Sequence, residues 1–520
     1  MLINQVTNRQ ISGNTLLYFI AGLVVLIIAF LVVDNYILID EPEVIAENEL
    51  QSTVETTDTT NETVADEAKA VLHNSVAVLP FENLSSNPDD AYFAVGIHEE
   101  ILDNLAKIQD LSAISRLSVL RYEGADKSIP EIASELNVET VMKGSVGYAD
   151  NRINIDVQLF DASGNDQLWS SVYERELSDI FVIRAEIVKH IVMALGAEVT
   201  TTEWARIESV PTHSLEAYKL YLKTKAIPSI IGENKPDVYY QILDQAIALD
   251  PGFALAHAFK ARGYALAKRT IRPIGGLTLE EMERAILEHA EMALTLDPNM
   301  GLAHMALAEI HYSHLRNTEA KQAYDRALQL NPNEMHILNA YARFLAVIKE
   351  YGEAIRLGQR VLELAPYVGT NHYLQGWTFM DADNPAAAAE QFRLAIALDP
   401  DFTRQINLGL AEILLGNKTE ALEALRIAEQ MIDETITTRG IARLAYAYSR
   451  LGFQEDAKRL FDLIQTRIAN GRFINDTYLA LAYLSIGEVE KARTLLNHDP
   501  YDAFNTLNYI KPGIVKGVVD

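Results

Sequence analysis

Apolar side chains recur along the second half of the chain in pairs of short stripes, each pair closed by a proline. Within residues 302–314, Leu307, Ala308 and Ile310 fall on one face of a helix, and a second such stripe within residues 320–327 consists of Ala320, Ala323, Tyr324 and Ala327. A proline then ends the unit because it cannot continue a helix. Four of these prolines follow one another at intervals of 34 residues: Pro298, Pro332, Pro366 and Pro400. A fixed period of this size predicts a solenoid of stacked helix pairs.

Small residues inside the unit predict close packing of its two helices. Alanines let the helix backbones approach, Tyr324 fills the space between them, and one pair must stack on its neighbours because it cannot bury its own apolar face. These positions resemble the tetratricopeptide repeat. Two copies meet the family's pattern, the first with Leu307, Ala308, Ala320, Tyr324, Ala327 and Pro332, the second with Gly376, Phe379, Ala388, Phe392, Ala395 and Pro400.

The same pattern sets the expected limits of the solenoid. The interval from Pro251 to Pro298 carries 13 extra residues, which we place between two helices around residues 268–279, with Thr278 and Glu281 as a capping box that restarts the second helix. After Pro400 the closing proline is lost, but Gly409 with Ala421, Tyr448 with Ala457 and Tyr483 with Ala492 keep the phase. We expect about eight repeats within residues 214–500, the last one degenerate, and a tail at residues 501–520.

Residues 71–200 carry a different pattern, in which strand-like runs precede and follow helical spacing. The turn residues Asp150-Asn151 and Ser163-Gly164-Asn165 separate the later strands as hairpins, so the order predicts a compact α/β domain. The expected strands are 75–80, a short one near 112–115, 140–148, 153–160 and 167–173, and the expected helices are 93–108, 129–136 and 183–195.

This α/β region resembles the TolB amino-terminal-like domain. The resemblance rests on SVAVLPFENLSSNPDDAYFAVGIHEEILDNLAKI (75–108), on VMKGSVGYADNRINIDVQLFDASGNDQLWSSVYER (141–175) and on the DIF of 179–181. In relatives, this domain followed by repeats is attached to a membrane-spanning winged-helix regulator or to a class III adenylate cyclase. Only about 15 residues precede the apolar segment of this chain, too few for either output domain. The resemblance therefore implies a binding or sensing unit.

A long apolar segment predicts one transmembrane helix at residues 16–39. Leu16 to Val33 spans 18 residues without a charged side chain, enough to cross the hydrocarbon core. No A-x-A pattern follows, so an uncleaved anchor is favoured over the alternative of a cleaved signal peptide. Arg9 in the short tail 1–15 favours a cytoplasmic amino terminus by the positive-inside rule. We expect a single-pass inner-membrane protein whose bulk lies in the periplasm.

Composition narrows the possible partners. Residues 40–70 are rich in Thr, Glu and Asp and too poor in apolar residues to fold, so we expect a disordered acidic linker. The whole chain has a formal net charge of -28, which argues against nucleic acid as a partner because neutralising phosphates needs clustered Lys and Arg. There are no cysteines, which excludes disulfides, thiolate nucleophiles and thiolate metal ligands.

The motifs that could carry chemistry are incomplete, so we expect no catalytic, cofactor or metal site and no enzyme. His98-Glu99-Glu100 lacks the second histidine of a zincin helix, and the GSVG of 144–147 has no Lys or Thr placed to hold phosphate. His311 and His314 have a spacing that could bind metal, but His304 and His311 fall on repeat positions where relatives place packing residues.

Function is then expected on the concave wall that the first helices of the repeats form. The family's groove positions, carried over to this chain, are Met305, Glu309, Tyr312, Asn339, Arg343, Tyr373, Trp377, Ile406, Leu410, Ala442 and Tyr446. This wall lacks the Lys and Asn set with which some tetratricopeptide domains clamp a terminal carboxylate. Trp377 is a candidate hot spot, and the alternative is that it packs against the next repeat.

Two functions follow from these expectations. The leading one is a membrane-anchored scaffold, without catalysis, that binds a protein or peptide partner in the concave groove. The alternative is a sensory subunit for a separately encoded transcription regulator or adenylate cyclase, coupled through the membrane helix.

Overall fold

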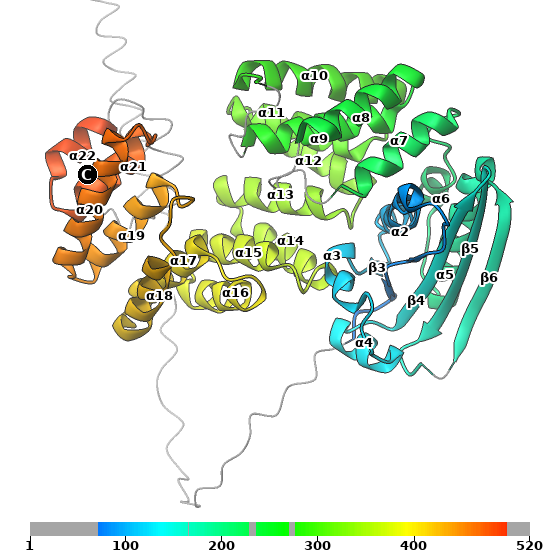
Figure 1. The fold of residues 1–520 in the computed structure, drawn as a ribbon, viewed down its shortest axis with the longest axis horizontal. Coiled ribbons are helices and arrows are strands. Elements are labelled where there is room, and N and C mark those ends of the chain that lie inside the picture. Colours follow the sequence, from blue (N-terminus) through cyan, green and yellow to red (C-terminus); the bar gives the residue numbers. More distant parts are fainter. Residues whose placement is uncertain (1–70, 165, 228–235, 270–275, 497–520) are drawn as a thin grey trace, which may run out of the picture. The chain divides into compact units, whose positions relative to one another are not determined.

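The computed structural model describes residues 71–164, 166–227, 236–269 and 276–496 (Figure 1). The expected membrane helix 16–39, the linker 40–70 and the tails 1–15 and 501–520 lie outside these residues. In the part of the chain that is described, no helix combines the length and the apolar character that a bilayer crossing requires.

A mixed β-sheet forms the core of the first region, which we call the sheet domain (β1 to α6). The strands lie in the order β3-β1-β4-β5-β6, and β2 pairs with β4 outside this path. β1 runs parallel to β3 and β4, whereas β4, β5 and β6 form an antiparallel meander. The strands are β1 Ser75–Val78, β2 Glu82–Asn83, β3 Ser112–Ala113, β4 Thr140–Ala149, β5 Arg152–Asp161 and β6 Gln167–Glu176.

The hairpin between β4 and β5 has the tight turn that the sequence predicts. Asp150 and Asn151 have φ angles of 51° and 62°, and Ala149 pairs with Arg152 directly across the turn. Positive φ at both central residues matches the twist of the flanking strands, and Asp and Asn tolerate it better than most residues.

Helices cover both faces of the central strands. Successive residues of a strand point to opposite faces, so Val76 and Val78 pack with α2 and α5, whereas Ala77 and Leu79 pack with α3 and α4. Every strand and helix predicted between residues 75 and 195 is present. The helices are η1 Pro88–Asp90, α2 Tyr92–Leu105, α3 Arg116–Val119, η2 Leu120–Tyr122, α4 Ile129–Leu136, η3 Leu177–Asp179, α5 Ile180–Leu195 and α6 Thr201–Ile207.

Helix pairs follow to the end of the described chain and form a tetratricopeptide-like solenoid (Figure 1). Glycine allows the helices of one pair to approach closely, since a Cβ on Gly376 would lie 2.5 Å from Cε1 of Phe392. The pairs are α7 Leu215–Lys225 with α8 Pro236–Leu249, α9 Ala254–Arg269 with α10 Leu279–Leu296, α11 Gly301–Ser313 with α12 Asn317–Leu330, α13 Met335–Val347 with α14 Tyr351–Leu364, α15 Gly369–Asp381 with α16 Pro385–Leu398, α17 Phe402–Leu415 with α18 Lys418–Gln430, α19 Thr438–Arg450 with α20 Gln454–Ala469, and α21 Asp476–Ser485 with α22 Val489–Leu496.

The extra residues of the second pair lie only in part between its helices, as predicted, because both helices are longer too: α9 has 16 residues and α10 has 18, against 13 in α11 and 14 in α12. α9 ends at Arg269 and α10 begins at Leu279. The capping box is present, because the Glu281 backbone N–H donates to Thr278 Oγ1 at 3.2 Å and the Thr278 backbone N–H donates to Glu281 Oε2 at 2.7 Å.

The sheet domain contacts two inter-repeat turns of the solenoid, a region that we call the turn contact. After α12, Asn333 Nδ2 donates to the carbonyls of Ile108 and Leu111 at 2.7 and 2.8 Å. After α14, the Tyr367 hydroxyl donates to the Glu135 carbonyl at 2.8 Å. These carbonyls follow α2 or lie near the end of α4, so side chains of the solenoid satisfy backbone groups of the sheet domain.

Candidate functional site

The eleven groove positions lie on the first helices of the third to seventh pairs, but they differ in exposure. Six polar or aromatic ones are partly exposed: Glu309, Tyr312, Asn339, Arg343, Tyr373 and Trp377. The others are buried in the packing between helices: Met305 (5% exposed), Ile406 (0%), Leu410 (4%), Ala442 (0%) and Tyr446 (6%). The partly exposed set is therefore the part of the predicted wall that presents side chains.

The amino-terminal part of this wall is built from ion pairs. Glu309 Oε1 lies 2.6 Å from Arg343 Nη2 and 3.5 Å from Arg269 Nη1. Burial raises the pKa of Glu309, but the two guanidinium groups outweigh it and hold this pKa below its ordinary value. Next to them, Asn339 Nδ2 donates to Asn371 Oδ1 at 3.2 Å. This part of the wall offers fixed charges and amides.

The next part of the wall is aromatic. The ring centroid of Trp377 lies 6.5 Å from that of Tyr373 and 6.3 Å from that of Phe392, both with edge-to-face geometry. The guanidinium of Arg443, which comes from α19, lies 5.7 Å from the indole centroid. Trp377 thus packs on the second helix of its own pair and also contacts a repeat further along, while part of its surface is exposed.

Of the histidines singled out in the repeats, His304 and His314 have polar partners, whereas the buried Nδ1 of His311 has no hydrogen-bond partner among the described residues. His304 Nε2 lies 3.1 Å from the carbonyl of Pro298, and His372 Nε2 lies 2.9 Å from the carbonyl of Pro366. In both repeats the histidine follows the closing proline by six residues and bonds to its carbonyl. His314 instead pairs with Glu283 of α10. Within the described ranges, no three His, Asp or Glu side chains gather in a way that could hold a metal ion.

His98 also has a structural role. Its ring is 1% exposed, its Nε2 lies 2.8 Å from the Val78 carbonyl, and it packs edge-to-face on Phe81. Burial lowers the pKa of His98 to about 4, so this histidine is neutral at physiological pH.

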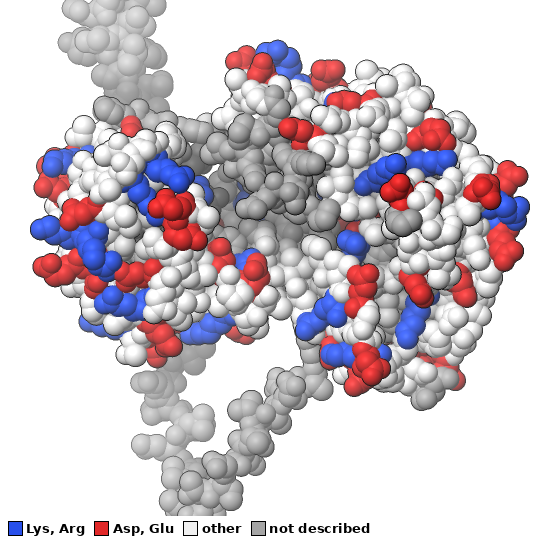
Figure 2. Space-filling model, viewed as in Figure 1, with Lys and Arg blue, Asp and Glu red and all other residues white. Residues whose placement is uncertain are grey.

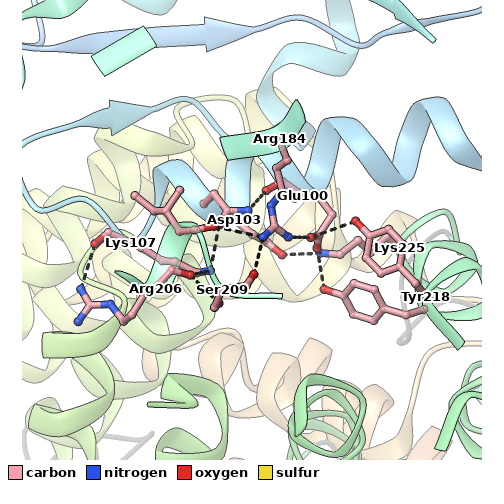
Figure 3. A network of polar contacts seen from close by, with 11 residues as sticks. Glu100, Asp103, Lys107, Arg184, Arg206, Ser209, Tyr218 and Lys225 are labelled. Carbon is pink, nitrogen blue, oxygen red and sulfur yellow. Dashed lines mark hydrogen bonds and ion pairs between the residues drawn. The ribbon is translucent and has the colours of Figure 1, made fainter. Parts of the chain in front are cut away.

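Sequence reasoning missed a buried ionic cluster next to His98, which we call the Glu100 network (Figure 3). Glu100 Oε2 accepts a hydrogen bond from Arg184 Nη1 at 2.8 Å, and Oε1 accepts one from the Tyr221 hydroxyl at 2.9 Å. Lys225 Nζ lies 3.4 Å from Oε1 and also pairs with Asp103. Glu100, Arg184 and Lys225 are only 3–4% exposed at their side chains.

The charges of this network compensate one another. Burial raises the pKa of Glu100, but Lys225 and Arg184 outweigh it and lower this pKa overall. Burial likewise lowers the pKa of Lys225, and the nearby Asp103 and Glu100 carboxylates raise it overall. Glu100 comes from α2, Arg184 from α5 and Lys225 from α7, so these buried ion pairs join two helices of the sheet domain to the first repeat.

One sequence signal could have identified the network. Glu100 lies three residues after Ile97 and next to Ile101, on the face of α2 that is buried. A carboxylate on the apolar face of a helix is rarely buried without a cationic partner.

Charged side chains on the surface are mixed in sign. Figure 2 shows acidic and basic residues interspersed over the face of the described residues that it presents. On that face they form no broad surface of one sign.

Comparison with known proteins identifies the helix pairs. The tetratricopeptide repeat family matches residues 305–368 and 373–433, so the pairs from α11 to α18 are tetratricopeptide repeats. A protein of Rhizobium meliloti (strain 1021) that is named as an adenylate cyclase is 38% identical over 184 residues, which cover 35% of this chain and 31% of that protein. The type IV pilus assembly protein PilF of Pseudomonas aeruginosa is 29% identical over 147 residues, which cover 26% of this chain and 57% of that protein.

The chain therefore spans about a third of the length of the first relative and just over half of the second. Among solved structures, that of Pseudomonas aeruginosa PilF has a TM-score of 0.33 at 18% identity and covers 45% of this chain and 98% of its own. A tetratricopeptide repeat protein from Parabacteroides merdae has a TM-score of 0.36 at 14% identity and covers 48% of this chain and 99% of its own.

Proposed function

We propose that this chain is a membrane-anchored scaffold, without catalysis, that recruits a protein or peptide partner through the concave wall of its solenoid. The observation that carries the proposal is the tetratricopeptide match over residues 305–368 and 373–433, which includes the Glu309–Arg343 ion pair and the partly exposed aromatic pair Tyr373 and Trp377. Aromatic anchors next to fixed charges are typical of protein interfaces. One relative is named as a type IV pilus assembly protein, and that name agrees with a role in binding other proteins during assembly.

The proposed anchor is the apolar segment 16–39, with a cytoplasmic amino terminus and the folded part in the periplasm. Two reporters fused after Asp520 test this topology, one active only outside the cytoplasm and the other only inside. Activity of the outside reporter alone supports the proposal. Activity of the inside reporter alone overturns the periplasmic location.

The wall is tested by site-specific crosslinking in cells. A photoreactive amino acid is placed at Tyr373, and the matched control carries it at Leu394, a residue of the second helix α16 that is 42% exposed. We expect a discrete crosslinked product from the Tyr373 position only, and its loss when Trp377→Ala is added. Equal products from both positions, or a product that Trp377→Ala leaves unchanged, would contradict binding at this wall.

A second candidate function is a sensory subunit of a signalling system, and two observations favour it. One is the 38% identity to the protein named as an adenylate cyclase. The other is an open cleft of about 250 Å³ between the sheet domain and α7, where Lys219 and Lys223 lie 5.6 and 4.9 Å from the rings of Tyr148 and Tyr92. If only the inside reporter is active, the solenoid faces cytosolic signalling proteins and this second function leads.

A further inference from the structure

Three side chains from three successive first helices meet on the wall: Trp377 of α15, Asn407 of α17 and Arg443 of α19. Arg443 Nη2 donates a hydrogen bond to Asn407 Oδ1, and the guanidinium carbon lies 5.7 Å from the centre of the Trp377 ring. Tyr373 extends the apolar side of this group through its edge-to-face contact with Trp377. We call these residues the Arg443 cluster.

The amide of Asn407 has a donor that is not used. The side chain is 1% exposed, and its Nδ2 has no hydrogen-bond partner among the described residues. Exchanging the amide oxygen and nitrogen does not remove the problem, because Arg443 is a donor and requires the oxygen on its own side. Within the described residues, the hydrogen bond from Arg443 is therefore what orients the Asn407 amide, and Asn407 in turn positions the Arg443 guanidinium.

Arg443 is also incompletely satisfied. No carboxylate lies within ion-pair distance of its guanidinium in the described part of the chain, although neighbouring repeats pair Arg393 with Glu412 and Arg426 with Asp456. This is unexpected in a chain whose formal net charge is -28. A guanidinium has five N–H donors, of which Asn407 uses one. The Arg443 cluster therefore presents unused donors and positive charge next to an aromatic surface.

We propose that the Arg443 cluster binds an aspartate or glutamate side chain of the partner, an inference that rests on the proposed scaffold function. The two carboxylate oxygens accept from N–H groups of the Arg443 guanidinium that Asn407 does not use. An apolar side chain next to that acidic residue packs on Trp377 and Tyr373. A carboxylate suits the cluster because it supplies two acceptors and a negative charge in one plane, and charge-assisted hydrogen bonds are stronger than neutral ones.

The test uses full-length chain in detergent and a panel of short synthetic peptides, acetylated and amidated so that their termini carry no charge. All peptides share one apolar sequence, and the central position is Glu, Gln or Lys. We expect the Glu peptide to bind at least about tenfold more tightly than the Gln peptide, as one charge-assisted contact predicts. Arg443→Ala should abolish this preference. The matched control is Arg439→Ala, since Arg439 is an exposed arginine of the same helix.

The outcomes distinguish failure of this inference alone from failure of the function on which it rests. If the Glu and Gln peptides bind alike and Arg443→Ala has no effect, but Trp377→Ala weakens both, the wall binds peptide and the acidic preference is wrong. If Arg439→Ala removes the preference as fully as Arg443→Ala, the effect is one of overall charge and the cluster is not the site. If no peptide of the panel binds the wild-type chain, the proposed binding wall fails together with the inference. Asn407→Ala, if folded, should reduce the preference less than Arg443→Ala.

Discussion

Replacing Glu100 by glutamine removes the charge at the centre of the Glu100 network while keeping its shape. Arg184 and Lys225 are each 4% exposed at their side chains, so both would become buried cations without their shared carboxylate. Removing one member of a buried ion pair typically destabilises a protein by about 3–5 kcal/mol. Arg184 retains the carbonyls of Ile207 and Ser209, and Lys225 retains Asp103, so we expect the lower end, about 3 kcal/mol.

The matched control is Glu216→Gln on α7, which makes the same chemical change at an exposed ion pair. Glu216 is 69% exposed and pairs with Lys219 at 2.7 Å on the same helix. Such pairs contribute about 0.5 kcal/mol or less, so this variant should unfold almost as the wild type does.

The assay is denaturant unfolding of the full chain in detergent, followed by tryptophan emission. The chain has three tryptophans, and Trp169 and Trp204 both lie in the sheet domain. In a Trp377→Phe background the emission therefore reports that domain alone. If Glu100→Gln shifts its unfolding no more than Glu216→Gln does, the network does not stabilise the junction and the reasoning is wrong.

The same variant has a pH signature. The folded pKa of Glu100 lies below its ordinary value of 4.5, so its contribution to stability is present above about pH 4.5 and is lost as pH falls through the folded pKa. The wild type should lose more stability below that pH than Glu100→Gln, which has no carboxyl at this position. Parallel pH curves would contradict this assignment.

Three further predictions concern other parts of the fold. The Nδ1 atoms of His257 and His289 lie 2.9 Å apart, and burial lowers the pKa of both rings, that of His289 to about 3. The stability of the protein should therefore fall as pH drops below about 6.5, the ordinary pKa of histidine. The thermal unfolding temperature of His289→Gln should depend less on pH than that of the wild type. Gly376→Ala should cost about 1–3 kcal/mol in denaturant unfolding because its Cβ would lie 2.5 Å from a ring carbon, whereas Gly352→Ala, with no atom within 4 Å, should be neutral or stabilise by up to about 1 kcal/mol. Asn333→Ala removes the donor of the Ile108 carbonyl and leaves the Leu111 carbonyl only its 3.4 Å contact from Arg360 Nη2, so it should cost about 1–3 kcal/mol, with faster hydrogen exchange in the turn after α12 as the readout.

The helix pairs could be predicted from the sequence because each depends on residues close together in the chain. Ala320, Tyr324 and Ala327 are all 0% exposed, as their spacing predicts, and Thr278 caps α10 as its capping box predicts. The individual strands and helices of the sheet domain were predictable for the same reason, since their apolar runs and the turn of the first hairpin are local signals, whereas the parallel pairing of β1 with β3 and β4 joins distant segments and was not predicted. Local pattern is sufficient wherever the stabilising contacts are local.

The Glu100 network and the turn contact could not be predicted, because their members are far apart in the sequence. Glu100 meets Arg184 across 84 residues and Tyr221 across 121, and Asn333 meets Ile108 across 225. No periodicity links such positions. Contacts between different repeats also explain why five of the eleven predicted groove positions are buried. Ile406 and Leu410 fall on groove positions of the repeat, yet both belong to a buried cluster that includes residues of the next pair.

The two junctions between the sheet domain and the solenoid have a mechanical consequence. Stacked repeats deform like a spring, because each pair moves only against its neighbours. The Glu100 network holds α7 at one end, and the turn contact holds the turns after α12 and α14, so the sheet domain braces the first four pairs. Elastic compliance is then concentrated in the pairs from α15 onward. A force applied to the pairs from α15 onward would bend those pairs first. The first four pairs, which the sheet domain holds, would move as a rigid unit with that domain.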